Sequence, residues 1–223
     1  MKIRLLTRQS CPVLLNILLA IAWFVLNGLP LAAHATELIN PSDINKPTKH
    51  SASANQQKLR VLRNLPESVK LTRINHFFNK FNNQTDKLNW GIDEYWATPR
   101  ELFKKGAGDC EDLAVAKYFF LIKLGVSEKQ LRLAYVKVYN SGKNTIEDHL
   151  VLLYDDNDKK QTLVLDNIAD TIKPLAQRRD LVPQFAFNIQ GSWALNPSYT
   201  TGSIAQSSVY RSWQTLLPRL ILN

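Results

Sequence analysis

Apolar positions recur along the chain with two different periods, and the period changes near Gly125. From Gln57 to Phe81 the apolar spacing is helical, and Pro66 divides the run into two short helices. Farther on, Thr98 and Glu101 form a capping box with proline at the first helical position, which predicts a helix over 99–105. The N-terminal half is therefore predicted to be helical.

The next predicted helix begins directly after a glycine-rich break at 106–108. Asp109 is placed to cap this helix, and Gly125 is placed to end it. Apolar side chains cover almost its whole circumference: Leu113, Val115, Ala116, Tyr118, Phe119, Phe120, Leu121, Ile122 and Leu124. A helix that is apolar nearly all round is buried in the middle of its domain.

Beyond Gly125 the apolar runs are short and rich in β-branched residues. Strands are predicted over 131–139, 150–154 and 162–168, with charged turn residues at 155–161. Helices followed by an antiparallel sheet give an α+β fold. In the C-terminal tail, residues 183–193 have an extended pattern and residues 209–222 the pattern of an amphipathic helix.

The first 35 residues have the pattern of a signal peptide. Three basic residues precede an uncharged apolar run at 13–26, and Ala33-His34-Ala35 supplies small residues at a cleavage site. The alternative is an uncleaved membrane anchor, for which this run is short. Residues 36–57 are polar and predict a flexible leader, so the domain is expected to cover 58–223.

Removal of this signal peptide changes the charge and the cysteine content. The formal charge falls from +9 to +6, because three basic residues and no acidic ones leave. The remaining charge is spread along the chain, which argues against nucleic-acid binding. Cys11 also leaves, so Cys110 is the only thiol of the mature chain and no internal disulfide can form.

Cys110 is the candidate nucleophile. It falls at the first position of the buried helix, where unpaired backbone amides and the helix dipole favour a thiolate. The same amides can hold an oxyanion during acyl transfer. A buried structural cysteine is the alternative, and this position alone does not decide between the two.

His149 and Asp166 are the candidate partners of Cys110. His50 falls in the leader and His76 in a helical pattern that favours a surface position, whereas His149 opens a strand. If the strands around the turn at 155–161 pair so that His149 lies opposite Asp166, their β-carbons are about 4.5 to 5.5 Å apart. An aspartate there would orient the imidazole. This register is assumed, and a slip of one residue would remove the contact.

Three carboxylates flank Cys110 within four residues, at Asp109, Glu111 and Asp112. Helix capping and compensation of the helix dipole are sufficient roles for Asp109 and Asp112. The combined negative charge would nevertheless raise the pKa of the thiol. A hard cation such as Ca²⁺, which prefers several oxygen ligands, would neutralise that charge.

The sequence resembles the bacterial transglutaminase-like cysteine proteases of the LapG type across most of residues 95–193. The blocks that carry the resemblance are Tyr95-Trp96-Ala97-Thr98-Pro99 with Glu101, Gly108-Asp109-Cys110-Glu111-Asp112 with Ala116-Lys117-Tyr118, His149 with Val151-Leu152, Leu165-Asp166-Asn167, and Arg178 with Asp180-Leu181 and Phe187-Asn188. The resemblance implies a papain-like core with a triad of Cys110, His149 and Asp166. Leu150 replaces the methionine expected after the histidine.

The resemblance also implies a cofactor, a substrate and a regulator. Calcium would be held by Asp109 and Glu111, and the substrate would be the N-terminal region of a large surface adhesin, whose cleavage releases cells from biofilm. An inner-membrane receptor for cyclic di-GMP would inhibit the protease in the periplasm. Two alternatives stay open: a transglutaminase that passes the acyl group to an amine, and a non-catalytic binding module.

Overall fold

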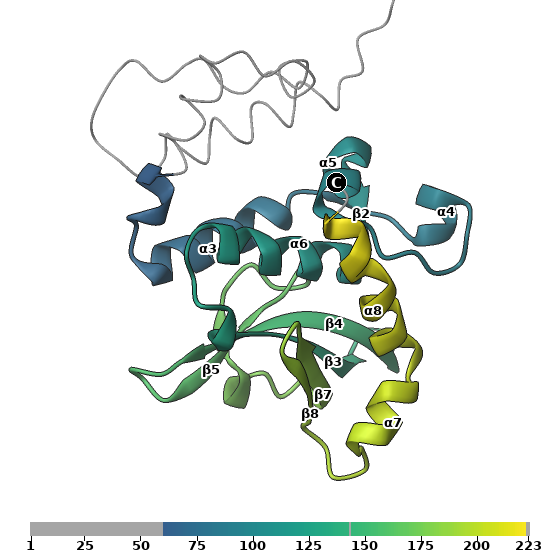
Figure 1. The fold of residues 1–223 in the computed structure, drawn as a ribbon. Helices are drawn as coiled ribbons and strands as arrows, with labels where there is room; N and C mark the ends of the chain where they lie inside the picture. Colours follow the sequence, from purple (N-terminus) through teal and green to yellow (C-terminus); the bar gives the residue numbers. More distant parts are fainter. Residues whose placement is uncertain (1–59, 143, 222–223) are drawn as a thin grey trace, which may run out of the picture. The chain divides into compact units, whose positions relative to one another are not determined.

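The computed structural model describes residues 60–142 and 144–221, and residues from Leu62 onward form one compact unit (Figure 1). The predicted signal peptide and leader lie outside the described residues. Residues 60–63 are helical, and Pro66 separates them from α3 at Glu67–Phe78, as the apolar spacing predicted. A short helix, α4 at Asp86–Trp90, then precedes α5.

Helices α5 (Pro99–Lys105) and α6 (Cys110–Lys123) confirm the predicted starts and ends. The Thr98 side chain accepts a hydrogen bond from the Glu101 amide, and the Glu101 carboxylate accepts one from the Thr98 amide, which completes the capping box. Gly125 follows α6 with φ of 83°, in the left-handed region that glycine adopts without strain. Between α5 and α6, β2 (Ala107–Gly108) pairs in parallel with β1 (Asn82–Asn83).

Six strands form one antiparallel sheet in the order β6-β5-β4-β3-β7-β8. Their bounds are Leu131–Asn140 for β3, Thr145–Asp156 for β4, Gln161–Leu165 for β5, Lys173–Pro174 for β6, Leu181–Asn188 for β7 and Gly191–Ala194 for β8. Two single turns of 3-10 helix, η2 (Glu128–Gln130) and η3 (Leu175–Gln177), precede β3 and β7. The fold is therefore α+β, as predicted.

Helix α6 lies between the sheet and the other N-terminal helices. It contacts β4 and β3 on one side and α3 and α5 on the other (Figure 1). Aromatic rings fill the contact between the three helices, with centroids 5.1 to 6.0 Å apart, and come from Phe77, Phe78, Phe81, Phe103 and Phe120. This burial on both sides explains why α6 is apolar around its circumference.

The C-terminal tail returns to the helical layer. Helix α7 (Thr201–Gln206), which the apolar pattern did not predict, leads into α8 (Ser208–Ile221). Trp213 is fully buried and anchors α8 by ring contacts to Phe119 of α6 and Phe187 of β7. No helix within the described part of the chain is long and apolar enough to cross a membrane.

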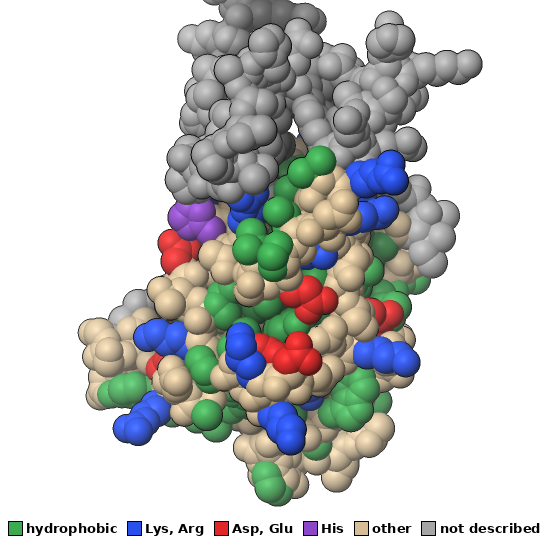
Figure 2. Space-filling model, turned by 90° about the vertical axis from the view of Figure 1, so that its left-hand side faces the viewer, with side chains coloured by type: hydrophobic (Ala, Val, Ile, Leu, Met, Phe, Trp, Pro, Cys, Tyr) green, Lys and Arg blue, Asp and Glu red, His purple; other side chains and the backbone are tan. Residues whose placement is uncertain are grey.

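Charged side chains are mixed on the surface. On the face that Figure 2 shows, lysines and arginines are distributed singly or in small groups among acidic and apolar side chains. The acidic stretch 155–158 makes local contacts: Asp155 at the end of β4 pairs with Arg132 of β3 at 2.8 Å, and Asp156 accepts a hydrogen bond from the Lys159 amide. This stretch therefore ends β4 and enters the turn that the sequence predicts.

Candidate active site and acidic cluster

Cys110 occupies the first position of α6, as predicted, and is half-buried. The residue two positions before it must be a glycine. A β-carbon at Gly108 would lie 2.7 Å from Asp112 Oδ2 and 2.7 Å from Leu102 Cδ1, closer than such atoms approach. The glycine thus allows the first turn of α6 to pack directly against the strand that leads into it.

His149 and Asp166 are brought together, although the assumed register was wrong by two residues. The ladder pairs Leu152 with Leu165 and ends there, so Asp166 lies just beyond β5 and diagonal to His149. His149 Nε2 nevertheless lies 2.8 Å from Asp166 Oδ1, and both side chains are almost fully buried. The contact survives because a shift of two residues keeps both side chains on the same face of the sheet.

The Asp166 carboxylate is contacted by Arg178, His149 and a backbone amide. Its Oδ2 forms an ion pair of 2.8 Å with Arg178, and its Oδ1 also accepts a hydrogen bond from the Ile168 amide. Lys117, a fully buried residue of α6, is close enough to be influenced by the charge of Asp166, but burial lowers the pKa of this lysine to about 7. Although burial opposes ionisation, the hydrogen bond from His149 and these other contacts hold the pKa of Asp166 well below its usual range.

The Cys110 sulfur lies close to the strand that carries His149. The Leu150 amide, next to His149 in β4, acts on the sulfur and favours its charged form. Burial and the charge of Glu111, whose Oε2 is 3.0 Å from Sγ, act in the opposite direction and are stronger. The pKa of the thiol is therefore raised well above its usual value.

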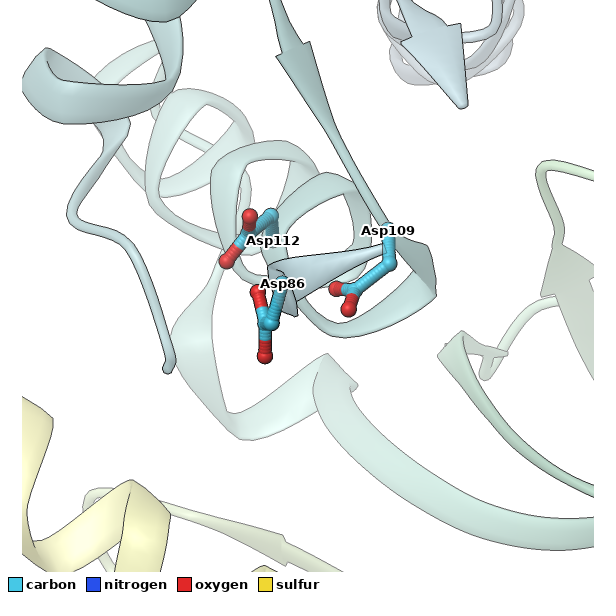
Figure 3. A group of neighbouring side chains, drawn as sticks. All are labelled: Asp86, Asp109 and Asp112. Atoms are coloured by element: carbon cyan, nitrogen blue, oxygen red, sulfur yellow. The ribbon is translucent and has the colours of Figure 1, made fainter. Parts of the chain in front are cut away.

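Three aspartates, one of which directly precedes Cys110 in the chain, converge near the start of α6. Asp86 at the start of α4, Asp109, and Asp112 in the first turn of α6 each bring an oxygen within 4.8 Å of the others (Figure 3). Asp109 holds the N-cap position, but its side chain makes no capping hydrogen bond. Figure 3 shows its carboxyl group turned toward the other two instead. The predicted side-chain cap at Asp109 is therefore wrong.

The carboxylates of this acidic cluster, Asp86, Asp109 and Asp112, are only partly compensated by the described part of the protein. One oxygen of each is buried without a hydrogen-bond partner there: Oδ1 of Asp86, Oδ1 of Asp109 and Oδ2 of Asp112. Burial raises the pKa of Asp112 to about 7, and burial together with the charges of Glu111 and Asp112 raises that of Asp109. A hard cation, which takes carboxylate oxygens as ligands, fits this donor set.

The acidic cluster differs from the ligand pair that the sequence suggested. Asp109 belongs to it, whereas Glu111 lies against the Cys110 sulfur. Asp86 was missed, because it lies far upstream in a stretch with no recognisable motif. Asp112 had been assigned to helix capping, and only the position of its carboxylate in space links it to Asp86.

A cysteine that starts a buried helix, packed on an antiparallel sheet that carries a His–Asp pair, defines a papain-like protein with a transglutaminase-like core. The chain belongs to the family of bacterial transglutaminase-like cysteine proteinases (BTLCP), whose sequence pattern matches residues 45–180. It is thus a member of a family of cysteine proteinases. No curated protein sequence is similar enough to count as a match.

Solved structures of Legionella pneumophila LapG are similar to the chain along most of its length. One is 33% identical, covers 73% of this chain and 83% of its own, and has a TM-score of 0.59. A calcium-bound LapG structure is 33% identical with a TM-score of 0.59, covering 73% of this chain and 84% of its own. An EGTA-treated one is 33% identical with a TM-score of 0.60, covering 73% and 83%.

Proposed function

We propose that the chain is a calcium-dependent cysteine endopeptidase with Cys110, His149 and Asp166 as its triad. The observation that carries the proposal is the His149–Asp166 contact of 2.8 Å beside the strand amide that acts on the Cys110 sulfur. Asp166 binds Nε2 of the imidazole, which leaves Nδ1 as the ring atom that exchanges a proton with the thiol. Family membership supports the proteolytic chemistry.

The reaction is acyl transfer to water. His149 takes the thiol proton while the Cys110 sulfur attacks the peptide carbonyl, and the Cys110 amide at the start of α6 donates to the developing oxyanion. The peptide C–N bond then breaks, and His149 returns the proton to the leaving amine. In the second half, His149 takes a proton from a water that attacks the thioester, the acid product leaves, and the thiol is restored.

Calcium is the cation we assign to the acidic cluster. Asp86, Asp109 and Asp112 would hold it, with Glu111 close by, and the calcium-bound LapG structure supports this choice. A bound divalent cation supplies positive charge that offsets the carboxylates. The pKa of the Cys110 thiol, which burial and Glu111 raise, would then fall toward the value that a nucleophile needs.

The proposed substrate is the N-terminal region of a large surface adhesin, cleaved in the periplasm so that cells leave a biofilm. The signal-peptide pattern at 1–35 and the similarity to LapG support export and this substrate class. Inhibition by an inner-membrane cyclic di-GMP receptor completes the proposal. A transglutaminase remains the competing function, because it uses the same triad with an amine in place of water.

The decisive experiment incubates the protein with N-terminal fragments of exported adhesins, with calcium and with EGTA. Cleavage should require calcium and should be lost in Cys110→Ala, whereas Asp158→Asn, which alters an exposed acid outside the acidic cluster, should cleave normally. Undiminished cleavage by Cys110→Ala would overturn the triad. Incorporation of a labelled amine without hydrolysis would favour the transglutaminase. Failure of iodoacetamide to label Cys110 selectively near neutral pH would favour a binding module.

A further inference from the structure

The segment Tyr95–Ala97, which connects α4 to α5, is bound to two carboxylates of the acidic cluster through its backbone. The Tyr95 amide donates to Asp86 Oδ2 at 2.5 Å, and the Ala97 amide donates to Asp112 Oδ1 at 2.6 Å. In each aspartate the other oxygen is the buried one that lacks a partner among the described residues. The connecting segment therefore holds one oxygen of each aspartate by a backbone hydrogen bond, which fixes the orientation of both carboxylates.

The connecting segment is fastened in turn by one residue of the C-terminal helix. Arg219 of α8 donates from Nη1 to the Trp96 carbonyl at 2.8 Å. Its Nη2 contacts both the Tyr95 hydroxyl and Glu101 Oε2, the latter at 2.5 Å. The guanidinium also lies over the Tyr95 ring, 4.6 Å from the centroid. Figure 1 shows α8 running past the sheet to the region of α5 and β2.

The planar guanidinium suits this position. It offers several N–H donors in a fixed fork, so that it can bind a carbonyl, a hydroxyl and a carboxylate together, and it stacks on an aromatic face. A lysine would present a single ammonium and could not reproduce the set. The hydroxyl-to-carboxylate contact between Tyr95 and Glu101, at 2.9 Å, closes the group.

We propose that Arg219 is a positioning residue for the metal site, acting through Tyr95–Ala97. The inference rests on the calcium site proposed above. Groups that orient the ligands of a metal without touching it commonly change its affinity by about 10- to 100-fold. Without Arg219 the connecting segment stays tied to α5 through the Thr98 cap and the Tyr95–Glu101 contact but loses its attachment to α8, which loosens the orientation of Asp86 and Asp112.

The test is calorimetric titration of calcium into the purified protein and three variants. Arg219→Met removes the fork and keeps an apolar stem of similar length. Arg211→Met is the matched control, because Arg211 lies on the same helix with an exposed side chain. Asp112→Asn removes a ligand. We expect Arg219→Met to bind calcium at least tenfold more weakly, Arg211→Met to bind it normally, and Asp112→Asn to show the largest loss.

Each outcome decides the inference. Binding by Arg219→Met within twofold of the native protein, with loss in Asp112→Asn, would overturn the role of Arg219 and leave the calcium site standing. No calcium binding by the native protein would overturn the site and the inference together. If Arg219→Met does not fold, Tyr95→Phe removes the shared hydroxyl without changing charge, and an unchanged calcium affinity in that variant would equally refute the inference.

Discussion

Asp166 and the three carboxylates of the acidic cluster lie in opposite electrostatic surroundings. Asp166 is contacted by His149 and Arg178, and its pKa is held well below the usual range. In the acidic cluster, Asp86, Asp109 and Asp112 mainly face one another, and the pKa of each is raised. Burial is the main cause of each raised pKa, the charge of Glu111 adds to all three, and repulsion from another aspartate of the cluster adds to those of Asp109 and Asp112.

This difference shows which carboxylates have their charge compensated by the chain's own residues. A buried carboxylate remains ionised only where charge or hydrogen bonds compensate it. The protein supplies that compensation to Asp166 from its own side chains. At the acidic cluster the described residues supply two backbone amides, from Tyr95 and Ala97, and leave three oxygens without partners. A cation bound from solution would compensate these three oxygens.

The largest expected effect is on catalysis at the compensated side. His149→Ala removes the proposed general base and should lower kcat by about 10²- to 10⁴-fold. Its effect on stability should be small, because Asp166 keeps its ion pair with Arg178. The control is His76→Ala. His76 lies on α3, its side chain is 38% exposed, and its Nδ1 is 3.7 Å from Asp170 Oδ2. If His149→Ala kept the kcat of the native protein, His149 would not be the general base.

The next effect is on stability at the same side. Arg178→Met should reduce the free energy of unfolding by about 3 to 5 kcal/mol, because it leaves the buried Asp166 charge without its cation. Urea unfolding followed by circular dichroism measures this. The neighbouring Arg179 is exposed, so Arg179→Met should change the value by less than about 0.5 kcal/mol. Equal stability of the two variants would contradict the compensation of Asp166 by Arg178.

Calcium should stabilise the protein through the acidic cluster. At a calcium concentration 100 times the Kd, the free energy of unfolding should rise by about 2.7 kcal/mol. Asp112→Asn should raise the free energy of unfolding in the absence of calcium, because it relieves repulsion between carboxylates. In the presence of calcium it should reduce the stabilisation, because it removes a ligand. Thermal unfolding of native protein, Asp112→Asn and Asp158→Asn with calcium and with EGTA measures both. A rise of similar size in all three would place the calcium elsewhere.

The smallest expected effect is the change in stability over a single pH unit in the calcium-free protein. Because the pKa of Asp112 is raised to about 7, the folded state retains a proton that the unfolded state loses above about pH 4. The free energy of unfolding therefore falls as pH rises from about 4 to 7, by at most about 1.4 kcal/mol per pH unit for one proton. Thermal unfolding in EGTA between pH 5 and 8 should show this fall, and saturating calcium should remove it.

Much of the site could be predicted from the sequence, because its parts depend on local signals. The break at 106–108 and the apolar run after it place Cys110 at a helix start. The prediction that His149 opens its strand was wrong, because β4 already begins at Thr145. The register between β4 and β5 could not be predicted. Turn length and packing set it, and the assumed pairing was two residues off.

The contacts that hold the acidic cluster in place could not be predicted from the sequence. Asp86 carries no motif, and Arg219 is separated from Trp96 by 123 positions of chain. Arg178 was noted only as part of a family resemblance, with no role attached. Each becomes meaningful through a neighbour that the fold brings from a distant element.

The starts of α5 and α6 and the helical N-terminal half could be predicted from the sequence alone. The sequence also identified Cys110 and His149 as the candidate reactive residues. These features follow from caps, glycines and apolar spacing, which act over a few neighbouring residues. The tertiary structure was needed to show that Asp166 is paired with Arg178 and His149, whereas Asp86, Asp109 and Asp112 lie together with three oxygens that lack partners among the described residues. Ionisation depends on charges and burial within a few ångströms in space, and residues far apart in the sequence supply both.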